Sequence, residues 1–260
     1  MKTAINEIFS SIQGEGQFAG YKQLFIRFCN CNLKCIYCDT DFLAGEPYTP
    51  QELYKKITAE YNIHTFHSIS LTGGEPLLSA EFLMEFLPLV KQKTKIYLET
   101  NATMPDKLIM LKNYIDIISA DIKLKSAAGF DTIHLHRKFF EHCRGIETFA
   151  KIVFDENITE TEIQDCCNLG REFNIALVLQ PKTQGVNSVS NLDEISTYNT
   201  SSQGVNADAN LDGVCETTGF KRVNKMCVSP EFCCKLLDRF TCRYKNVRLI
   251  PQVHKFLEVK

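Results

Sequence analysis

The sequence predicts an α/β fold in which a mostly parallel sheet is covered by helices and curls into a partial (β/α) barrel. Short runs of β-branched and aromatic residues alternate with helical stretches along the 260-residue chain, as in repeated βα units. Several runs are continuously apolar, as expected of parallel strands covered on both faces. The chain is short for a full eightfold barrel, which favours a partial one.

The predicted strands follow from these runs, in chain order. They are Ile5–Phe9, Leu24–Phe28, Ser68–Leu71, Lys95–Leu98, Ile115–Ser119, Phe149–Phe154, Ile175–Leu179 and Val247–Ile250.

Three helix starts carry capping signals between the strands. Thr49-Pro-Gln-Glu52 and Thr159-Glu-Thr-Glu162 are capping boxes, and Ser229-Pro-Glu begins a helix with proline at its first position.

One segment interrupts the alternation. The stretch from Gln184 to Asn224 is rich in Ser, Asn, Asp, Gly and Thr and has few large apolar residues, which predicts a long insertion without a core of its own. We therefore expect a single domain over residues 1–260 with a polar insertion at about 184–224.

Composition excludes several classes of function. The net charge is −2 and no dense Lys/Arg stripe occurs, so we expect no nucleic-acid partner and no electrostatic membrane anchor. No apolar run approaches the roughly 18 residues of a membrane-spanning helix, and the first residues lack the apolar segment of a secretory signal. A cytoplasmic location is expected, where twelve cysteines are metal ligands and reduced thiols rather than disulfides.

Three cysteines within eight residues form the strongest motif. Three residues separate Cys31 from Cys35, and two separate Cys35 from Cys38. A cubane cluster has four irons, so three thiolates leave one iron free to bind a small molecule. An open coordination position is typical of a metal site built for chemistry.

Polar residues also follow most of the predicted strands, where ligands bind in βα folds. The cysteine loop, Thr72-Gly-Gly-Glu75, Glu99-Thr-Asn101, Asp121 with Lys123, Gln180, and Gln252 with His254 each come after a strand. This pattern predicts a large ligand that reaches across the sheet. The glycine pair, Gly73 and Gly74, is expected to let backbone groups approach that ligand closely.

The cysteine spacing resembles the signature of the radical S-adenosylmethionine (SAM) superfamily, and within it the chain resembles the 7-carboxy-7-deazaguanine synthases. The resemblance runs from near Asn6 to the end of the sequence. Its motifs are Ser11-Ile-Gln13-Gly-Glu15-Gly16, Phe25-Ile-Arg27-Phe, Cys38-Asp-Thr40, Thr72-Gly-Gly-Glu75, Glu99-Thr-Asn101, Gln180-Pro and Gln252-Val-His254-Lys.

This resemblance implies a partial barrel of radical SAM type and a Mg2+-dependent lyase. The enzyme would convert 6-carboxy-5,6,7,8-tetrahydropterin to 7-carboxy-7-deazaguanine with loss of ammonia, in queuosine or deazapurine biosynthesis. The implied cofactors are a 4Fe-4S cluster, SAM and Mg2+. The implied partners are the pterin substrate, a flavodoxin- or ferredoxin-type reductant and a second copy of the chain in a homodimer.

The resemblance also implies roles for individual residues, and no catalytic residue is assigned beyond ligands of the cofactors. The cluster ligands are Cys31, Cys35 and Cys38, and the Mg2+ ligand is Thr40. The expected substrate-binding residues are Ile12, Gln13, Gly14, Glu15, Arg27, Thr72, His254 and Lys260. The expected SAM-binding residues are Tyr37, Gly74, Glu75, Asn101, Ser119, Asp121, Lys123 and Gln180.

Two of these residues carry a second interpretation. Glu15 could serve the substrate or cap the adjacent turn, and His254 could be a packed core imidazole.

Two other functions remain open at this stage. Asp121-Ile-Lys123 stands where the family has Ser-Pro-Lys and resembles the Asp-x-Lys of enzymes that install a glycyl radical on a partner protein. A non-catalytic iron–sulfur or zinc-binding protein is the alternative from another class.

The remaining cysteines and histidines favour structural interpretations. Cys29 is expected to be a strand residue, and the cysteines after the motif are expected to be buried free thiols rather than an auxiliary cluster. His134, His136 and His142 are expected to be surface or packed histidines rather than zinc ligands.

Overall fold

The computed structural model describes residues 1–38, 45–183, 226–257 and 259. The predicted insertion at 184–224 lies outside the described residues. Within them the strands form one sheet in the order β3-β1-β2-β4-β5-β6-β7-β8-β9. Their bounds are β1 Thr3–Ile12, β2 Lys22–Phe28, β3 Glu46–Tyr48, β4 Ser68–Gly73, β5 Lys95–Thr100, β6 Ile117–Ile122, β7 Glu147–Phe154, β8 Ala176–Pro181 and β9 Val247–Leu249.

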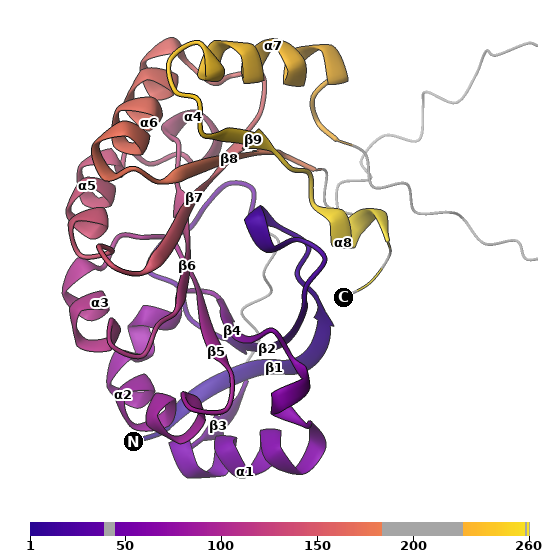
Figure 1. Ribbon diagram of the computed structural model, residues 1–260, viewed down its shortest axis with the longest axis vertical. Coiled ribbons are helices and arrows are strands. Elements are labelled where there is room, and N and C mark those ends of the chain that lie inside the picture. Colours follow the sequence, from indigo (N-terminus) through magenta and orange to yellow (C-terminus); the bar gives the residue numbers. More distant parts are fainter. Residues whose placement is uncertain (39–44, 184–225, 258, 260) are drawn as a thin grey trace, which may run out of the picture.

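The sheet is parallel from β2 to β9, while β1 pairs antiparallel with both β2 and β3. In the described part of the chain the outer strands β3 and β9 do not pair with each other, so the barrel is open (Figure 1). The predicted α/β class and the open form of the barrel are thereby confirmed. The sequence prediction missed β3 and placed the fifth strand two residues too early, since β6 begins at Ile117.

The longer helices cover the convex side of the curved sheet, while α8 lies at its open side (Figure 1). The α-helices are α1 Pro50–Glu60, α2 Ala80–Val90, α3 Pro105–Leu111, α4 Lys125–Ala128, α5 Ile133–Glu141, α6 Glu160–Phe173, α7 Pro230–Thr241 and α8 Val253–Phe256, and the 3-10 turns are η1 Gly16–Phe18, η2 Ile63–Thr65 and η3 Pro76–Ser79. The predicted capping boxes at the starts of α1 and α6 are present, and Ser229 caps α7.

Alternation along the strands divides the sheet into two faces. One face carries Leu24, Leu71, Leu98 and similar apolar residues, and it packs against the helices in the main core. The opposite face carries a smaller cluster of Tyr97, Ile117, Phe149, Ala176 and Val178, against which Phe18 of η1 packs. We call this second surface the inner face; its remaining positions are largely polar.

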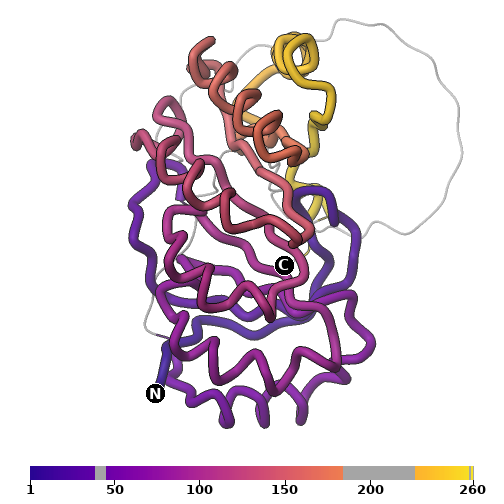
Figure 2. Tube along the Cα trace, turned by 60° about the vertical axis from the view of Figure 1, so that its left-hand side comes forward, coloured from indigo at the N-terminus to yellow at the C-terminus, as the bar shows by residue number. Residues whose placement is uncertain are grey.

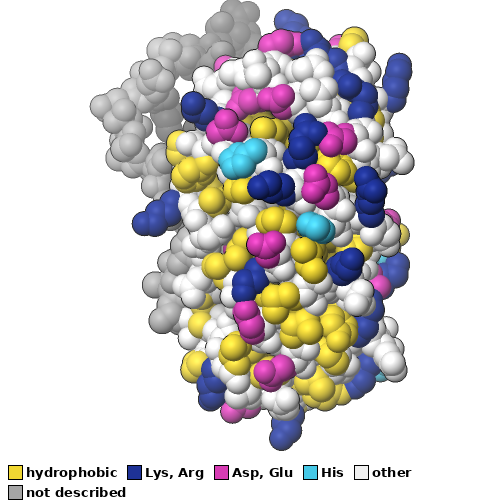
Figure 3. All heavy atoms as spheres, turned by 90° about the vertical axis from the view of Figure 1, so that its left-hand side faces the viewer, with side chains coloured by type: hydrophobic (Ala, Val, Ile, Leu, Met, Phe, Trp, Pro, Cys, Tyr) yellow, Lys and Arg dark blue, Asp and Glu magenta, His cyan; other side chains and the backbone are white. Residues whose placement is uncertain are grey.

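The C-terminal segment meets the turn between β1 and β2 at the open side of the barrel (Figure 1). The turn between β1 and β2 and the C-terminal segment around α8 lie side by side in both ribbon and tube (Figures 1 and 2), and a hydrogen bond joins Gln252 to Glu15. On the helical face, basic and acidic side chains are interspersed (Figure 3). None of the described helices has the length and apolar character needed to cross a bilayer.

Candidate active site

The inner face gathers polar side chains in rows that cross the strands. Strand register aligns Arg27 with Thr72, and Glu99 with Ser119. One row further toward the carboxyl ends, Asp121 is aligned with Lys151. Because side chains two residues apart on a strand share a face, these rows form one continuous surface. The surface lies at the edge of the sheet where ligands bind in βα folds.

The three predicted cluster cysteines lie in one loop that leaves the end of β2. Cys31 and Cys35 are partly buried, and Cys38 is exposed. The N–H of Leu33 donates to Sγ of Cys31 (3.4 Å), and the N–H of Cys38 donates to the carbonyl of Cys35 (3.1 Å). The loop thus turns on itself and presents the three thiols from one short stretch.

Two thiols of this loop have a pKa above the usual value. Burial raises the pKa of Cys31 and of Cys35, and Lys123 lowers both. Cys31 and Cys38 each raise the pKa of Cys35, so the thiols lie within electrostatic range of one another.

The arrangement of the thiols also fits a cluster. Within the described ranges, no three His, Cys, Asp or Glu side chains converge on a single ion. A cubane takes one thiolate per iron, so its ligands need only surround it. Three thiols beside a buried cation are therefore a donor set that fits a 4Fe-4S cluster.

Lys123 connects the cysteine loop to β6. Its ammonium donates to Oδ2 of Asp121 (2.7 Å) and to the hydroxyl of Tyr37 (3.2 Å), and it lies 5.3 Å from the centre of the Tyr37 ring. Burial lowers the pKa of Lys123, but Asp121, Tyr37 and Cys35 outweigh burial and raise it. The ammonium therefore stays charged at the inner face.

Asn101, at the end of β5, is turned toward the same loop. Its side-chain amide donates to Oδ1 of Asn32 (2.8 Å) and lies 3.8 Å from Sγ of Cys31. Its Oδ1 accepts from the hydroxyl of Thr103 (2.6 Å). Both the nitrogen and the oxygen of the Asn101 amide are therefore hydrogen-bonded, and the residue holds the cysteine loop against the sheet.

Glu75 is turned into the protein, at 1% exposure. Its carboxylate accepts from the N–H of Leu77 (3.0 Å), the hydroxyl of Thr100 (2.9 Å) and the N–H of Asn101 (2.8 Å). Burial raises the pKa of Glu75 to about 7, although these donors lower it. Glu75 therefore ties the end of β4 to the end of β5, and within the described residues its bonds are all to the protein.

Gly74, the second residue of the glycine pair after β4, also has a packing role. A Cβ at Gly74 would lie 2.1 Å from the carbonyl oxygen of Asn30, and the N–H of Gly74 donates to the carbonyl of Phe28 (3.0 Å). The missing side chain thus lets the turn pack against the backbone that enters the cysteine loop. The glycine serves this close packing whatever ligand binds beside it.

Gln180 and Ser119 are buried on the inner face. Gln180 is 3% exposed, and its Oε1 has no hydrogen-bond partner among the described residues. A buried acceptor without a donor is unfavourable unless a ligand or water supplies one. This orphaned oxygen, together with the charges of Asp121 and Lys123, fits a zwitterionic ligand such as SAM.

The turn after β1 is built around Gln13. Its side-chain amide donates to Oε1 of Gln23 (3.0 Å) and to Oε1 of Glu99 (2.8 Å), and its oxygen accepts from the N–H of Glu15 (3.0 Å). Ile12 ends β1 immediately before this turn. The predicted substrate residues at 12–15 are thereby brought to the inner face.

Gly14 and His254 join this turn to α8. The N–H of Val253 donates to the carbonyl of Gly14 (2.8 Å), and a Cβ at Gly14 would lie 1.9 Å from Nδ1 of His254. His254 is partly exposed rather than part of the core. It therefore packs on the backbone of the predicted substrate-binding turn.

The carboxylate of Glu15 does not cap the turn, so that interpretation was wrong. It forms an ion pair with Lys151 and accepts from Nε2 of Gln252 (2.5 Å). Burial raises the pKa of Glu15, but Lys151, Gln252 and His254 together lower it to about 2.

Arg27 and Thr72 lie side by side on β2 and β4. Nε of Arg27 is 3.5 Å from Glu7, and the guanidinium lies 5.5 Å from the centre of the Phe9 ring. The hydroxyl of Thr72 donates to Oε2 of Glu99 (2.7 Å). Arg27 is partly exposed and keeps donor capacity for an anionic ligand.

Some predictions lie outside the described residues or differ from the structure. Thr40, Lys260 and Cys215 are outside the described ranges. Cys29 is buried one residue beyond β2 rather than within it. Among the later described cysteines, those at 143, 166, 167 and 233 are buried as expected, but Cys227 is only partly buried, Cys234 is exposed on α7 and Cys242 is exposed just after it.

Three residues of the site were given no role from the sequence. Glu99 accepts from Gln13 and Thr72, although only its motif was noted. Lys151 is buried on β7, where it is the single charged residue of the apolar run Phe149–Phe154, a signal that could have been used. His136 is fully buried, and its Nδ1 lies 3.3 Å from the carbonyl of Ala102; its position on α5 gave no such signal.

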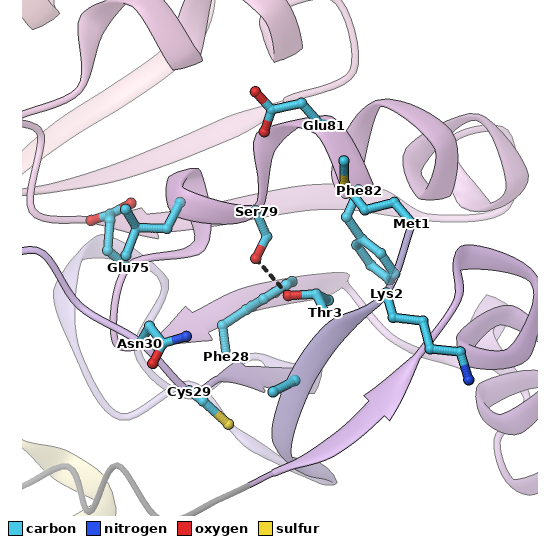
Figure 4. A pocket seen from close by; sticks show the side chains of 12 residues that line it. Met1, Lys2, Thr3, Phe28, Cys29, Asn30, Glu75, Ser79, Glu81 and Phe82 are labelled. Atoms are coloured by element: carbon cyan, nitrogen blue, oxygen red, sulfur yellow. Dashed lines mark hydrogen bonds between the residues drawn. The ribbon is translucent and has the colours of Figure 1, made fainter.

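A separate cavity of about 320 Å3 lies on the other side of the cysteine loop (Figure 4). Its wall is formed by the N-terminal residues 1–4, by Phe28 to Asn30 and by the start of α2. A hydrogen bond between Thr3 and Ser79 (2.7 Å) bridges two of its sides. Of the predicted site residues, only Glu75 contributes to this wall, so the cavity is distinct from the inner face.

Comparisons with known proteins identify relatives of the chain. The radical SAM superfamily profile matches residues 25–144. The 7-carboxy-7-deazaguanine synthase of Geobacter sulfurreducens is 32% identical over 97% of this chain and 96% of its own length. That of Methanothermobacter thermautotrophicus is 32% identical over 100% and 99%. The crystal structure of QueE from Escherichia coli superposes with a TM-score of 0.51 at 21% identity, over 70% of this chain and 83% of that one, which supports the fold alone.

Proposed function

The chain belongs to the 7-carboxy-7-deazaguanine synthase family of the radical SAM superfamily, and we propose that it is a Mg2+-dependent lyase that converts 6-carboxy-5,6,7,8-tetrahydropterin to 7-carboxy-7-deazaguanine with loss of ammonia. One observation carries the proposal within this chain. The three-cysteine loop, the Asp121–Lys123 pair and the Gln13–Glu15 turn all border the same polar inner face. A redox cofactor and a polar substrate could therefore meet there.

Cys31, Cys35 and Cys38 would hold the cluster. When bound, the cluster and SAM supply one-electron reduction and hydrogen abstraction, and Mg2+ polarises substrate oxygens. Burial raises the pKa of Cys31 and Cys35 above the usual value, and Lys123 offsets part of that rise.

Residues on β6 and β8 would hold SAM. The carboxylate of Asp121 and the ammonium of Lys123 are complementary to the amino and carboxyl groups of its methionine part. The orphaned oxygen of Gln180 would accept a hydrogen bond, and Ser119 lies beside them on the same face. Tyr37 and Gly74 would offer backbone groups, while Glu75 and Asn101 keep the neighbouring loops in place.

The pterin would lie against the turn after β1. Arg27 presents a planar donor suited to its carboxylate. Gln13, Thr72 and Glu99 form a bonded set of amide, hydroxyl and carboxylate, which suits the amino and ring nitrogens of a pterin. Such fixed polar groups would orient the substrate without large rearrangement.

Several further assignments rest on the family resemblance. They are Thr40 as the Mg2+ ligand, Ile12, Gly14, Glu15, His254 and Lys260 as substrate-binding residues, a flavodoxin- or ferredoxin-type reductant, a homodimer, and one domain over 1–260 with an insertion at 184–224.

Anaerobic turnover tests the proposal. Reconstituted protein should bind roughly four irons per chain and form 7-carboxy-7-deazaguanine from the carboxypterin, SAM, Mg2+ and dithionite, as measured by mass spectrometry. Replacing Cys31, Cys35 and Cys38 by alanine should remove both iron and product, whereas Cys234→Ala, at an exposed cysteine on α7, should leave both intact. SAM cleavage without a deazapurine product would instead favour an enzyme that activates a partner protein.

A further inference from the structure

Lys151 is a charged residue in the middle of β7 for which the proposed chemistry gives no role. It is 6% exposed and lies between the apolar residues Ala150 and Ile152 of the same strand. Its side chain points to the inner face, in the row that also contains Asp121. A buried ammonium is costly unless it is paired, so its partners indicate its purpose.

Those partners come from two different parts of the site. The ammonium forms an ion pair with Glu15, which lies in the turn after β1, and it lies 3.1 Å from Oδ1 of Asp121 on β6. Glu15 adjoins the predicted pterin contacts at Gln13 and Gly14. Asp121 belongs to the predicted SAM contacts. One cation thus bonds to a residue of each site.

The connection continues beyond Lys151 in both directions. On one side, the second oxygen of Asp121 accepts from Lys123, whose ammonium also donates to Tyr37 in the cysteine loop. On the other side, Glu15 accepts from Gln252 next to α8. A continuous line of charged and polar contacts therefore runs from the C-terminal helix across the inner face to the cluster loop.

We propose that Lys151 is a positioning residue that couples the pterin site to the SAM site, so that each ligand binds more tightly when the other is present. The inference rests on the proposed function for the identity of the two ligands, but the physical link between Glu15 and Asp121 does not. Coupling carried by a shared, buried contact is reciprocal, and such couplings typically amount to about 5–150-fold in affinity.

The charges on the two sides explain why the coupling depends on Lys151. Two carboxylates, of Glu15 and Asp121, face the ammonium groups of Lys151 and Lys123. A ligand that moves Asp121 toward or away from Lys151 changes the strength of the ion pair between Lys151 and Glu15. Removing Lys151 takes away the ion-pair partner of Glu15 and leaves its hydrogen bond from Gln252, so the position of its turn no longer depends on Asp121.

The test measures SAM affinity by calorimetry in reconstituted protein that is kept oxidised, so that no turnover occurs. Glu15→Gln should weaken SAM binding about fivefold or more, although Glu15 belongs to the turn after β1. Lys151→Met should weaken it similarly, and the double variant should be no worse than Lys151→Met alone. Lys151→Arg, which keeps the charge, should restore part of the affinity.

A second measurement addresses the pterin directly. The affinity for 6-carboxypterin, a stable oxidised analogue, is measured by fluorescence with and without SAM. In the unmodified protein SAM should tighten binding about fivefold or more, and in Lys151→Met the ratio should fall to about one. Lys91→Met is the matched control, because it breaks another Lys–Asp pair, with Asp116 before the start of β6, and should leave the ratio unchanged.

If Lys151 had a structural role only, its replacement would change the stability of the protein without coupling Glu15 to SAM binding. In metal-free protein, Lys151→Met should lower the melting temperature because Glu15 is left buried without a cation, and adding Glu15→Gln should recover most of that loss. If Glu15→Gln weakens SAM binding equally with and without Lys151, or has no effect, the inference is overturned. Failure to bind the carboxypterin would contradict the proposed function alone. The SAM affinities of the two single variants and the double variant would still decide the role of Lys151.

Discussion

The side-chain amide of Asn101 lies 3.8 Å from Sγ of Cys31, although 70 residues separate the two in the chain. The same amide donates to Asn32. The end of β5 therefore holds the first cysteine of the loop against the sheet. The loop is also attached through the bonds of Tyr37 to Lys123 and of Asn32 to Thr103, but Asn101 is the residue beyond the loop that bonds to the first cysteine itself among the described residues.

We expect Asn101→Ala to weaken the hold on the cysteine loop. The change removes the donor to the amide oxygen of exposed Asn32 and the acceptor of the Thr103 hydroxyl, which still accepts from Nδ2 of Asn32 (2.9 Å), so the loss should be about 1 kcal/mol. Iron should be lost faster to a chelator, and thermal stability should fall. Asn168→Ala removes an exposed amide on α6 and should change neither quantity; equal iron loss in both variants would contradict the role of Asn101.

Glu75 should make stability fall as the pH rises. Burial holds its pKa at about 7 in the folded protein against 4.5 for the free side chain. The folded state therefore binds its proton more tightly, and the contribution of Glu75 to stability is greatest below pH 4.5 and declines through pH 7, by about 3 kcal/mol. Denaturant unfolding of Glu75→Gln between pH 5 and 8 should lack this decline.

Glu85→Gln, at an exposed position of α2, is the control for this experiment. It should keep the pH dependence of the unmodified protein. A Glu75→Gln protein with the same pH profile as the control would show that Glu75 remains ionised throughout.

His136 should make stability fall as the pH falls, the opposite of the effect of Glu75. Burial holds its pKa near 4 in the folded protein, below the usual 6.5. The unfolded state therefore takes up the proton more readily, and the contribution of neutral His136 is lost as the pH falls from 6.5 to 4. Its Nε2 accepts from the N–H of Lys123 (3.2 Å) and lies 2.8 Å from Oγ1 of Thr132.

Replacing this histidine tests that assignment. His136→Phe should destabilise the protein by at least about 2 kcal/mol, because buried polar partners are left unsatisfied, and should flatten the acid side of the stability profile. Since Lys123 is one of those partners, SAM affinity should also fall. His134→Phe, on the exposed side of α5, should do none of this, and similar losses in the two variants would sink the prediction.

Arg27 should discriminate pterins by their carboxylate. A charge-assisted hydrogen bond contributes about 1.5–3 kcal/mol, so Arg27→Met should weaken binding of 6-carboxypterin roughly 10–100-fold. Binding of pterin without the carboxylate should be nearly unchanged, which fluorescence titration can measure. Equal losses for both ligands would mean that Arg27 shapes the site through Glu7 and Phe9 instead.

The sequence alone determined the class of fold and the identity of the cysteine loop. Cys31, Cys35 and Cys38 are close in the chain, so their spacing already limits how they can be arranged. The capping boxes at Thr49 and Thr159 likewise act over three residues, and both are present in the structure. Local signals of this kind are readable because the interacting groups are neighbours in sequence.

Only the tertiary structure decided which side chains meet on the inner face. Glu15 and Lys151 are 136 residues apart, and the sequence around one of them does not indicate that the other is its partner. The same holds for Glu99, which accepts from Gln13 and Thr72, and for Glu75, which links the end of β4 to the end of β5. Strand register and the curl of the sheet set these encounters, because they bring distant residues into one row and exclude water from between them.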